Sequence, residues 1–146
     1  MKKKTVITNS AQLIFPSCSI NESLARSFIS SFMMQLNPTV EDISDVKCAV
    51  SEAVTNSIVH GYSGTVGIIK IKASLTDERI VIIDIIDKGC GISDVKKALE
   101  PLFTTNTDGE RSGMGFTVME TFTDKMKVYS KEGHGTRVRL IKKIAA

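Results

Sequence analysis

The sequence has few cysteines and no long hydrophobic run, and both absences narrow the class of protein. Its three cysteines, Cys18, Cys48 and Cys90, are widely spaced and form neither a CxxC pair nor a zinc-ligand pattern, so we expect a reducing compartment. The first residues, MKKKTVITNS, lack the apolar segment of a signal peptide. No apolar run approaches the roughly 20 residues that a membrane-spanning helix needs. These absences predict a cytoplasmic protein without membrane contact.

Several common functional motifs are also missing. The absence of GxxxxGK[ST] excludes a P-loop NTPase, and no strand–GxGxxG–helix unit supports a Rossmann dinucleotide site. Without HExxH or a cluster of other ligands, a zinc site is not supported. The net charge of +3 is small, and its lysines gather at the ends of the chain, so we expect no direct nucleic-acid partner.

Composition and length predict one soluble globular domain over residues 1–146. The chain is 42% hydrophobic and 24% charged, which is ordinary for such a domain. It contains no internal repeat and no low-complexity linker. At this length a chain buries most of the surface that it exposes when unfolded.

Apolar periodicity and turn residues predict an α+β fold. The expected strands are residues 11–16, 66–75, 79–87, 125–130 and 136–142, and the expected helices are residues 22–36, 40–60, 94–100 and 115–123. A long loop over residues 101–114 precedes the last helix, and loops of this length are usually functional lids or disordered. This order is typical of a two-layer sandwich, with helices on one face of a mixed, mostly antiparallel sheet.

The first predicted helix is amphipathic, and we expect Ser19 or Asn21 to cap it, as Ser93 is expected to cap residues 94–100. Its core-facing stripe is predicted to be Leu24, Phe28, Phe32 and Leu36, widened by Ile20, Ile29 and Met33. Glu22 and Arg26 fall outside that stripe, where they would face solvent or a partner.

The second predicted helix, ending at Gly61, carries Glu52, Asn56 and His60 at intervals of four. At about 100° per residue these side chains span roughly 80° of the helical wheel. The core-facing arc beside them contains Val46, Val50, Ala53, Val54 and Ser57. The polar stripe therefore borders the core, where a cleft would open, although a solvated helix edge has the same pattern.

Three glycine-containing segments lie at junctions between predicted elements. In Asp87-Lys88-Gly89-Cys90-Gly91 a carboxylate ends a strand and two glycines permit close backbone approach to a ligand. In Arg111-Ser112-Gly113-Met114-Gly115 a glycine-rich loop opens a helix, whose N-terminus together with Arg111 suits a phosphate. Gly133-His134-Gly135-Thr136 joins the last two strands. Each segment alone is also compatible with a plain turn.

The segments SEAVTNSIVHG, DKGCG, RSGMGF and HGT, in this order, resemble the boxes of the Bergerat-type ATP-binding fold shared by DNA gyrase B, Hsp90, sensor histidine kinases and MutL. The longer segments NESLARSFISSF, NPTVEDISDVKCAVSEAVTNSIVHGYSG and PLFTTNTDGERSGMGFTVME closely resemble the anti-sigma F factors of endospore-forming bacteria. The resemblance covers roughly residues 11–141.

This resemblance implies an activity and partners. It implies a protein serine kinase that uses ATP and Mg²⁺, inhibits sigma factor F, and phosphorylates and thereby inactivates an anti-anti-sigma factor. The alternative is a nucleotide-switched module that sequesters the sigma factor and has little kinase activity. A homodimer is also implied. Because residues 80–86 offer apolar side chains on both sheet faces, the face without helices could be its contact. Asp84 interrupts this run without a predicted role.

The resemblance also implies roles for individual residues. Asn56 would coordinate the Mg²⁺ that bridges the phosphates, and Glu52 would act as general base or orient the attacking hydroxyl. Asp87, supported by Thr136, would hydrogen-bond the adenine amino group. His60 would only shape the pocket.

The glycine boxes have implied roles as well. Gly89 and Gly91 would let the backbone lie against the nucleotide. Gly113, Gly115 and the helix that begins there would receive the phosphates, beneath a lid formed by residues 101–114.

Overall fold

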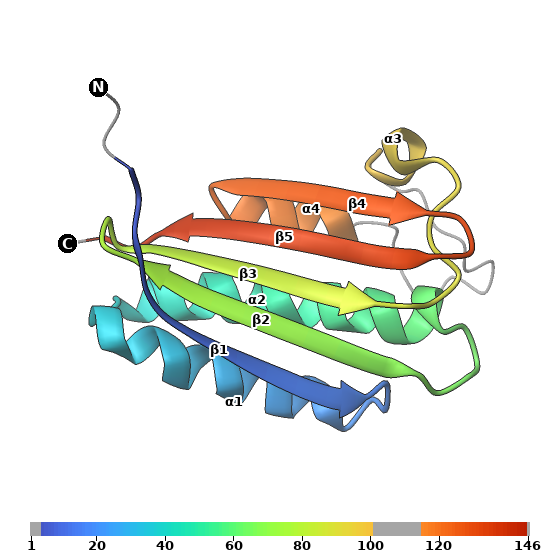
Figure 1. Ribbon diagram of the computed structural model, residues 1–146, viewed down its shortest axis with the longest axis horizontal. Coiled ribbons are helices and arrows are strands. Elements are labelled where there is room, and N and C mark those ends of the chain that lie inside the picture. The colour runs from blue at the N-terminus through green and yellow to red at the C-terminus, as the bar shows by residue number, and fades with distance from the viewer. Residues whose placement is uncertain (1–3, 101–114, 146) are drawn as a thin grey trace.

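The computed structural model describes residues 4–100 and 115–145, and in these ranges it forms two layers. The sheet has the strand order β1-β2-β3-β5-β4, and helices cover one of its faces (Figure 1). The strands are β1 (Ile7–Pro16), β2 (Ile68–Thr76), β3 (Ile80–Asp87), β4 (Lys125–Lys131) and β5 (Gly135–Lys143). All four strand pairings are antiparallel. The predicted α+β sandwich is confirmed, while the parallel pairing of a mixed sheet does not occur among these strands.

The helical layer contains the expected helices in the expected order. The α-helices are α1 (Asn21–Met33), α2 (Val40–Asn56), α3 (Val95–Ala98) and α4 (Gly115–Phe122). A 3₁₀ turn, Met34–Leu36, extends α1, and a π-helical turn, Ser57–Gly61, extends α2. No helix in the described ranges is both long and apolar enough to cross a bilayer.

The core lies between the central strands and α2. Alternate residues of β3, Val81, Ile83 and Ile85, are at most 1% exposed, because successive side chains of a strand point to opposite faces. The predicted core arc of α2 is confirmed: Val46, Val50, Ala53, Val54 and Ser57 are all buried. Its polar stripe therefore borders the core.

The predicted core stripe of α1 is wrong at its N-terminal end. Leu24 is 47% exposed and Ile20 is 81% exposed, whereas the buried residues of the helix are Ala25, Ile29, Phe32 and Met33. A four-residue repeat advances by about 40° per step around a helix of 3.6 residues per turn. A stripe drawn through every fourth residue therefore drifts off the buried face.

Two predicted helix caps also differ from the structure. The residue before α1 is Ile20, without a side-chain cap, and the Asn21 amide donates instead to the Pro16 carbonyl at 3.0 Å. For α3 the cap is Asp94, whose Oδ1 accepts from the Lys97 backbone N–H at 3.1 Å. Asp94 can cap because α3 begins one residue later than predicted.

Asp84 gains a role from strand pairing. It lies opposite Arg139 in the β3–β5 ladder, on the sheet face away from the helices. The guanidinium donates to both carboxylate oxygens, at 2.8 and 2.9 Å. This bidentate ion pair explains a charged residue in the middle of the apolar run of β3.

Candidate functional site

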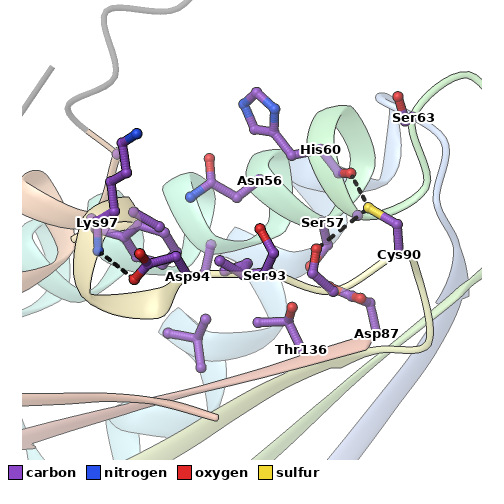
Figure 2. A pocket seen from close by; sticks show the side chains of 18 residues that line it. Asn56, Ser57, His60, Ser63, Asp87, Cys90, Ser93, Asp94, Lys97 and Thr136 are labelled. Atoms are coloured by element: carbon purple, nitrogen blue, oxygen red, sulfur yellow. Dashed lines mark hydrogen bonds between the residues drawn. The ribbon is translucent and has the colours of Figure 1, made fainter. Parts of the chain in front are cut away.

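A cavity of about 510 Å³ opens where α2, the segment after β3, α3, the start of α4 and β5 meet. This volume is within the range of small-molecule sites. Figure 2 shows Asn56 on the side of the cavity near Lys97, and Asp87 on the side near Cys90. Four other predicted residues also line it: His60, Gly91, Gly115 and Thr136. The structure therefore brings together residues that lie up to 80 positions apart in the sequence.

Asp87 ends β3 and is 5% exposed. Its Oδ2 accepts a hydrogen bond from the Ser57 hydroxyl at 2.7 Å, and its Oδ1 accepts from the Gly89 backbone N–H at 3.0 Å. A carboxylate offers about four lone-pair sites. Two sites are therefore left for a ligand that donates hydrogen bonds.

Thr136 lies beside Asp87 in the β3–β5 ladder. Its hydroxyl is 2.8 Å from the Ser130 hydroxyl, which in turn donates to the Gly135 carbonyl at 2.9 Å. Either hydroxyl of this pair can donate to the other. In the arrangement in which the Ser130 hydrogen lies on the Gly135 carbonyl, Thr136 donates to Ser130 and keeps its own lone pairs. Together, Asp87 and Thr136 offer acceptors to the cavity.

Asn56, the last residue of α2, faces the first residue of α4. A Cβ on Gly115 would lie 3.1 Å from the Asn56 Nδ2 and 3.2 Å from its Oδ1, closer than most side chains allow. Glycine at 115 therefore permits the N-terminus of α4 to approach the amide. An amide oxygen beside backbone N–H groups suits a phosphate and its hard cation.

The glycines after β3 shape the wall of the cavity. A Cβ on Gly89 would collide with the Gly61 carbonyl oxygen, and Gly91, at φ +73°, leaves no room for one beside the Lys131 carbonyl. Gly91 lines the cavity, whereas Gly89 packs against the end of the π-helical turn. Both glycines are therefore required by close backbone contacts.

Glu52 lies one turn before Asn56 and is half-buried, but it does not line the cavity. The charge of its carboxylate affects the pKa of the Cys48 thiol, which lies one helical turn earlier. Burial raises the pKa of the Cys48 thiol, and the negative charges of Glu52 and Asp45 raise it further. Glu52 thus lies on the same helix as Asn56, one turn away from this residue of the cavity wall.

Sequence reasoning missed several residues of the cavity. Cys90 donates from Sγ to the His60 carbonyl at 3.1 Å, and its backbone N–H donates to the Gly61 carbonyl at 2.8 Å. Asp94, Lys97 and Ser93 also line the cavity. Their only sequence signal was proximity to the glycine box. The predicted residues Arg111 and Gly113, with the rest of the predicted lid, lie outside the described residues.

The donor set fits a nucleotide with one hydrated cation. In the described ranges, no group of three or more His, Cys, Asp or Glu side chains is placed to hold a metal ion. Mg²⁺ at nucleotide sites usually keeps several waters and takes one or two protein ligands besides phosphate oxygens. The Asn56 amide oxygen is compatible with that mode of binding.

Comparisons with known proteins agree with this geometry. Residues 15–142 match the family model described as a histidine kinase-like ATPase domain. An anti-sigma F factor of Thermoanaerobacter sp. (strain X514) is 53% identical over 139 residues, covering 95% of this chain and 96% of the relative. One from Clostridium acetobutylicum is 49% identical over 140 residues, covering 96% of this chain and 97% of the relative.

Solved structures share the fold at low sequence identity. A Mycobacterium tuberculosis structure with RsbU and RsbW domains has a TM-score of 0.69 at 18% identity, covering 95% of this chain and 33% of that one. A blue-light activated histidine kinase domain from Erythrobacter litoralis EL346 has a TM-score of 0.56 at 16% identity, covering 84% of this chain and 61% of that one. At such identities the likeness concerns the fold alone.

Proposed function

The chain belongs to the anti-sigma F factors, built on the histidine kinase-like ATPase domain, and from this premise we propose a specific function. The protein binds and inhibits sigma factor F, and uses ATP with Mg²⁺ to phosphorylate a serine of an anti-anti-sigma factor. The observation that supports ATP as ligand is the pairing of a buried acceptor group, Asp87, with the Asn56–Gly115 contact in one cavity.

The proposed base-binding end is formed by Asp87 and Thr136. Asp87 keeps two lone-pair sites after accepting from Ser57 and Gly89. These sites accept from the adenine amino group, and Thr136 supports the same edge. Gly91 lets the backbone approach the nucleotide. Gly89 lets the segment that contains Gly91 pack against the Gly61 carbonyl.

The proposed phosphate-binding end is formed by Asn56 and the start of α4. Asn56 supplies an amide oxygen to Mg²⁺, which neutralises phosphate charge when bound. Gly115 admits the backbone N–H groups of the helix N-terminus to the phosphates. Gly113 and Arg111 are proposed as further phosphate contacts on the strength of the family resemblance.

In the proposed reaction, the serine hydroxyl of the partner attacks the γ-phosphorus of ATP. The bond from that phosphorus to the β,γ-bridging oxygen breaks, ADP leaves, and the hydroxyl proton passes to the Glu52 carboxylate. One turn of α2 separates Glu52 from Asn56, about 6 Å along the helix axis. One rigid helix thus carries both the base and the cation ligand.

A second candidate function is a nucleotide-switched module that sequesters sigma factor F with little kinase activity. The observation that favours it is that Glu52 is not among the described residues that line the cavity. Nucleotide would then change only the affinity for the sigma factor.

Radiolabel transfer from ATP to a purified anti-anti-sigma factor separates the two functions. The proposed kinase transfers label, and Glu52→Gln binds ATP normally but transfers label at least about 100-fold more slowly. Full-rate transfer by Glu52→Gln contradicts the base role. Absence of transfer by the wild type, with a sigma-factor affinity that depends on nucleotide, supports the switch instead.

We also propose a homodimer, as the family resemblance implies, with its contact on the sheet face away from the helices. Ile82 and Ile86 of β3 are half-buried on that face. Sedimentation of the wild type as a dimer, and of Ile82→Glu as a monomer, is expected. A wild type that is monomeric at micromolar concentration contradicts this proposal.

A further inference from the structure

Ser57 is a buried polar residue of the cavity that was predicted only as part of the core-facing arc of α2, without a role in binding. It is the first residue of the π-helical turn and is 6% exposed. Its hydroxyl donates to the Asp87 Oδ2 at 2.7 Å, and the residue lines the cavity. Figure 2 shows this hydrogen bond between the end of α2 and the end of β3. Ser57 therefore connects the two elements that carry Asn56 and Asp87.

The surroundings of Asp87 explain why this hydroxyl matters. The carboxylate is 5% exposed, and none of the ion pairs among the described residues includes it. Burial of a charged group is costly unless hydrogen bonds compensate. Among the described residues, the Ser57 hydroxyl and the Gly89 N–H donate hydrogen bonds to this carboxylate.

The π-helical turn holds Ser57 in this position. The Tyr62 backbone N–H donates to the Ser57 carbonyl at 2.9 Å, which closes the wide turn. At the other end of the turn, a Cβ on Gly61 would lie 3.1 Å from the Asp87 Oδ2. The carboxylate is thus enclosed by the turn, with the hydroxyl on one side and a residue without a side chain on the other.

We propose that Ser57 is a specificity-determining residue for the nucleobase. This inference rests on the proposed binding of ATP in the cavity. The single Ser57 hydrogen is committed to Asp87, so the Ser57 oxygen keeps only lone pairs. Ser57 therefore orients Asp87 and also makes the base-binding edge one of acceptors alone.

An edge of acceptors discriminates between purines by their exocyclic groups. The 6-amino group of adenine donates hydrogen bonds, whereas the 6-oxygen of guanine is an acceptor that would face acceptors. A site built to pair one polar group rejects analogues that leave its buried groups unpaired. Ser57 thus selects a purine with an amino group at position 6.

The test compares triphosphates that differ at position 6 of the base. Dissociation constants for ATP, GTP and purine riboside triphosphate, which carries hydrogen at position 6, are measured for the wild type and Ser57→Ala. We expect Ser57→Ala to weaken ATP binding about tenfold and to leave purine riboside triphosphate within about threefold. The selectivity ratio between these two ligands therefore falls.

Ser17→Ala is the matched control. Ser17 is 5% exposed, and its hydroxyl accepts from the Gly67 backbone N–H at 2.9 Å, outside the cavity. This variant also loses the hydroxyl of a buried serine, but one that does not contact Asp87. We therefore expect its selectivity ratio between ATP and purine riboside triphosphate to equal that of the wild type. If Ser57→Ala does not fold, Ser57→Cys, which has similar size and a weak donor, is expected to lower the ratio in the same direction.

The outcomes separate this inference from the proposed function. A wild type that does not bind ATP contradicts the proposed function. A wild type that prefers ATP, with a Ser57 variant that keeps the same selectivity ratio, contradicts only the role of Ser57. An equal loss of affinity for ATP and purine riboside triphosphate also contradicts it, because a merely structural role predicts that result.

Discussion

The Glu22 carboxylate of α1 accepts a hydrogen bond from the Thr55 hydroxyl of α2 at 3.0 Å. Its other oxygen accepts from the Ser51 hydroxyl at 2.5 Å and from the Arg26 guanidinium at 3.0 Å. Ser51 and Thr55 directly precede Glu52 and Asn56 in the sequence. The first helix thereby fixes how α2 is rotated, and with it the direction of the two residues to which we assign chemistry.

Glu22→Ala is expected to lower the free energy of unfolding by about 1–2 kcal/mol, because the Ser51 hydroxyl and the Arg26 guanidinium lose the Glu22 carboxylate as acceptor. The Thr55 hydroxyl keeps the Ser51 carbonyl as an acceptor at 2.8 Å. Chemical denaturation measures the change in free energy. Glu22→Gln keeps one acceptor oxygen, so its free energy of unfolding should fall by less than that of Glu22→Ala. Glu132→Ala, at an exposed turn, is the control and should stay within about 0.5 kcal/mol. A Glu22→Ala protein as stable as that control would contradict a stabilising role for the hydrogen bonds between Glu22 and α2.

Gly115→Ala is expected to separate nucleotide affinity from stability. The new Cβ would press on the Asn56 amide, so ATP affinity should fall about tenfold or more, whereas alanine favours a helix by up to about 1 kcal/mol relative to glycine. Titration calorimetry and thermal melting measure the two quantities. Glu120→Ala, exposed on the same helix, should change neither by much. Unchanged ATP affinity in Gly115→Ala would mean that the close approach of α4 is not used by the ligand.

The Asp84–Arg139 ion pair is expected to be strongly coupled. Asp84 is 7% exposed and Arg139 is partly exposed. Asp84→Ala leaves the guanidinium without its bidentate partner, which should cost about 2–3 kcal/mol of unfolding free energy. In a double-mutant cycle, Asp84→Ala with Arg139→Met should cost less than the sum of the single changes. Strict additivity of the two changes would contradict a direct interaction.

Cys48 is expected to be the least reactive of the three thiols. Burial and the charges of Glu52 and Asp45 raise its pKa, so less thiolate is present at a given pH, whereas Cys18 and Cys90 are exposed. Alkylation followed by mass spectrometry at pH 8 should show modification of Cys48 at least about tenfold slower than that of Cys18. Equal rates would contradict the raised pKa.

The same shift makes a prediction about stability. Because the folded pKa of Cys48 lies above the ordinary value of 9.0, the folded state holds this proton more tightly than the unfolded state. Its stabilising contribution is therefore complete below about pH 9 and is lost as the pH rises through the folded pKa. Cys48→Ala should show a smaller decline of unfolding free energy between pH 8.5 and 10 than the wild type.

Local patterns were sufficient for the order of the elements and for the junctions that line the cavity. Asp87 after an apolar strand, Gly61 at the end of a helical run and Gly115 before an apolar helix are each recognisable from neighbouring residues. The core-facing arc of α2 followed from the helical period, whereas the nearly continuous apolar run of residues 80–86 did not show which of its side chains face the helices. The caps of α1 and α3 were missed because a shift of one residue in a helix start changes which side chain can cap it.

The sequence by itself determined the α+β class, the family, and the placement of Asp87, Gly115 and Thr136 at the ends of elements, since these depend on short-range periodicity and turn chemistry. Asn56 was expected inside a helix over residues 40–60, whereas the structure ends α2 at Asn56 and continues it as a π-helical turn. Tertiary structure alone decided which polar groups pair. Asp84 and Arg139 are 55 residues apart, and Ser57 and Asp87 are 30 apart. Such partners depend on strand register and on how α2 packs against α1 and β3.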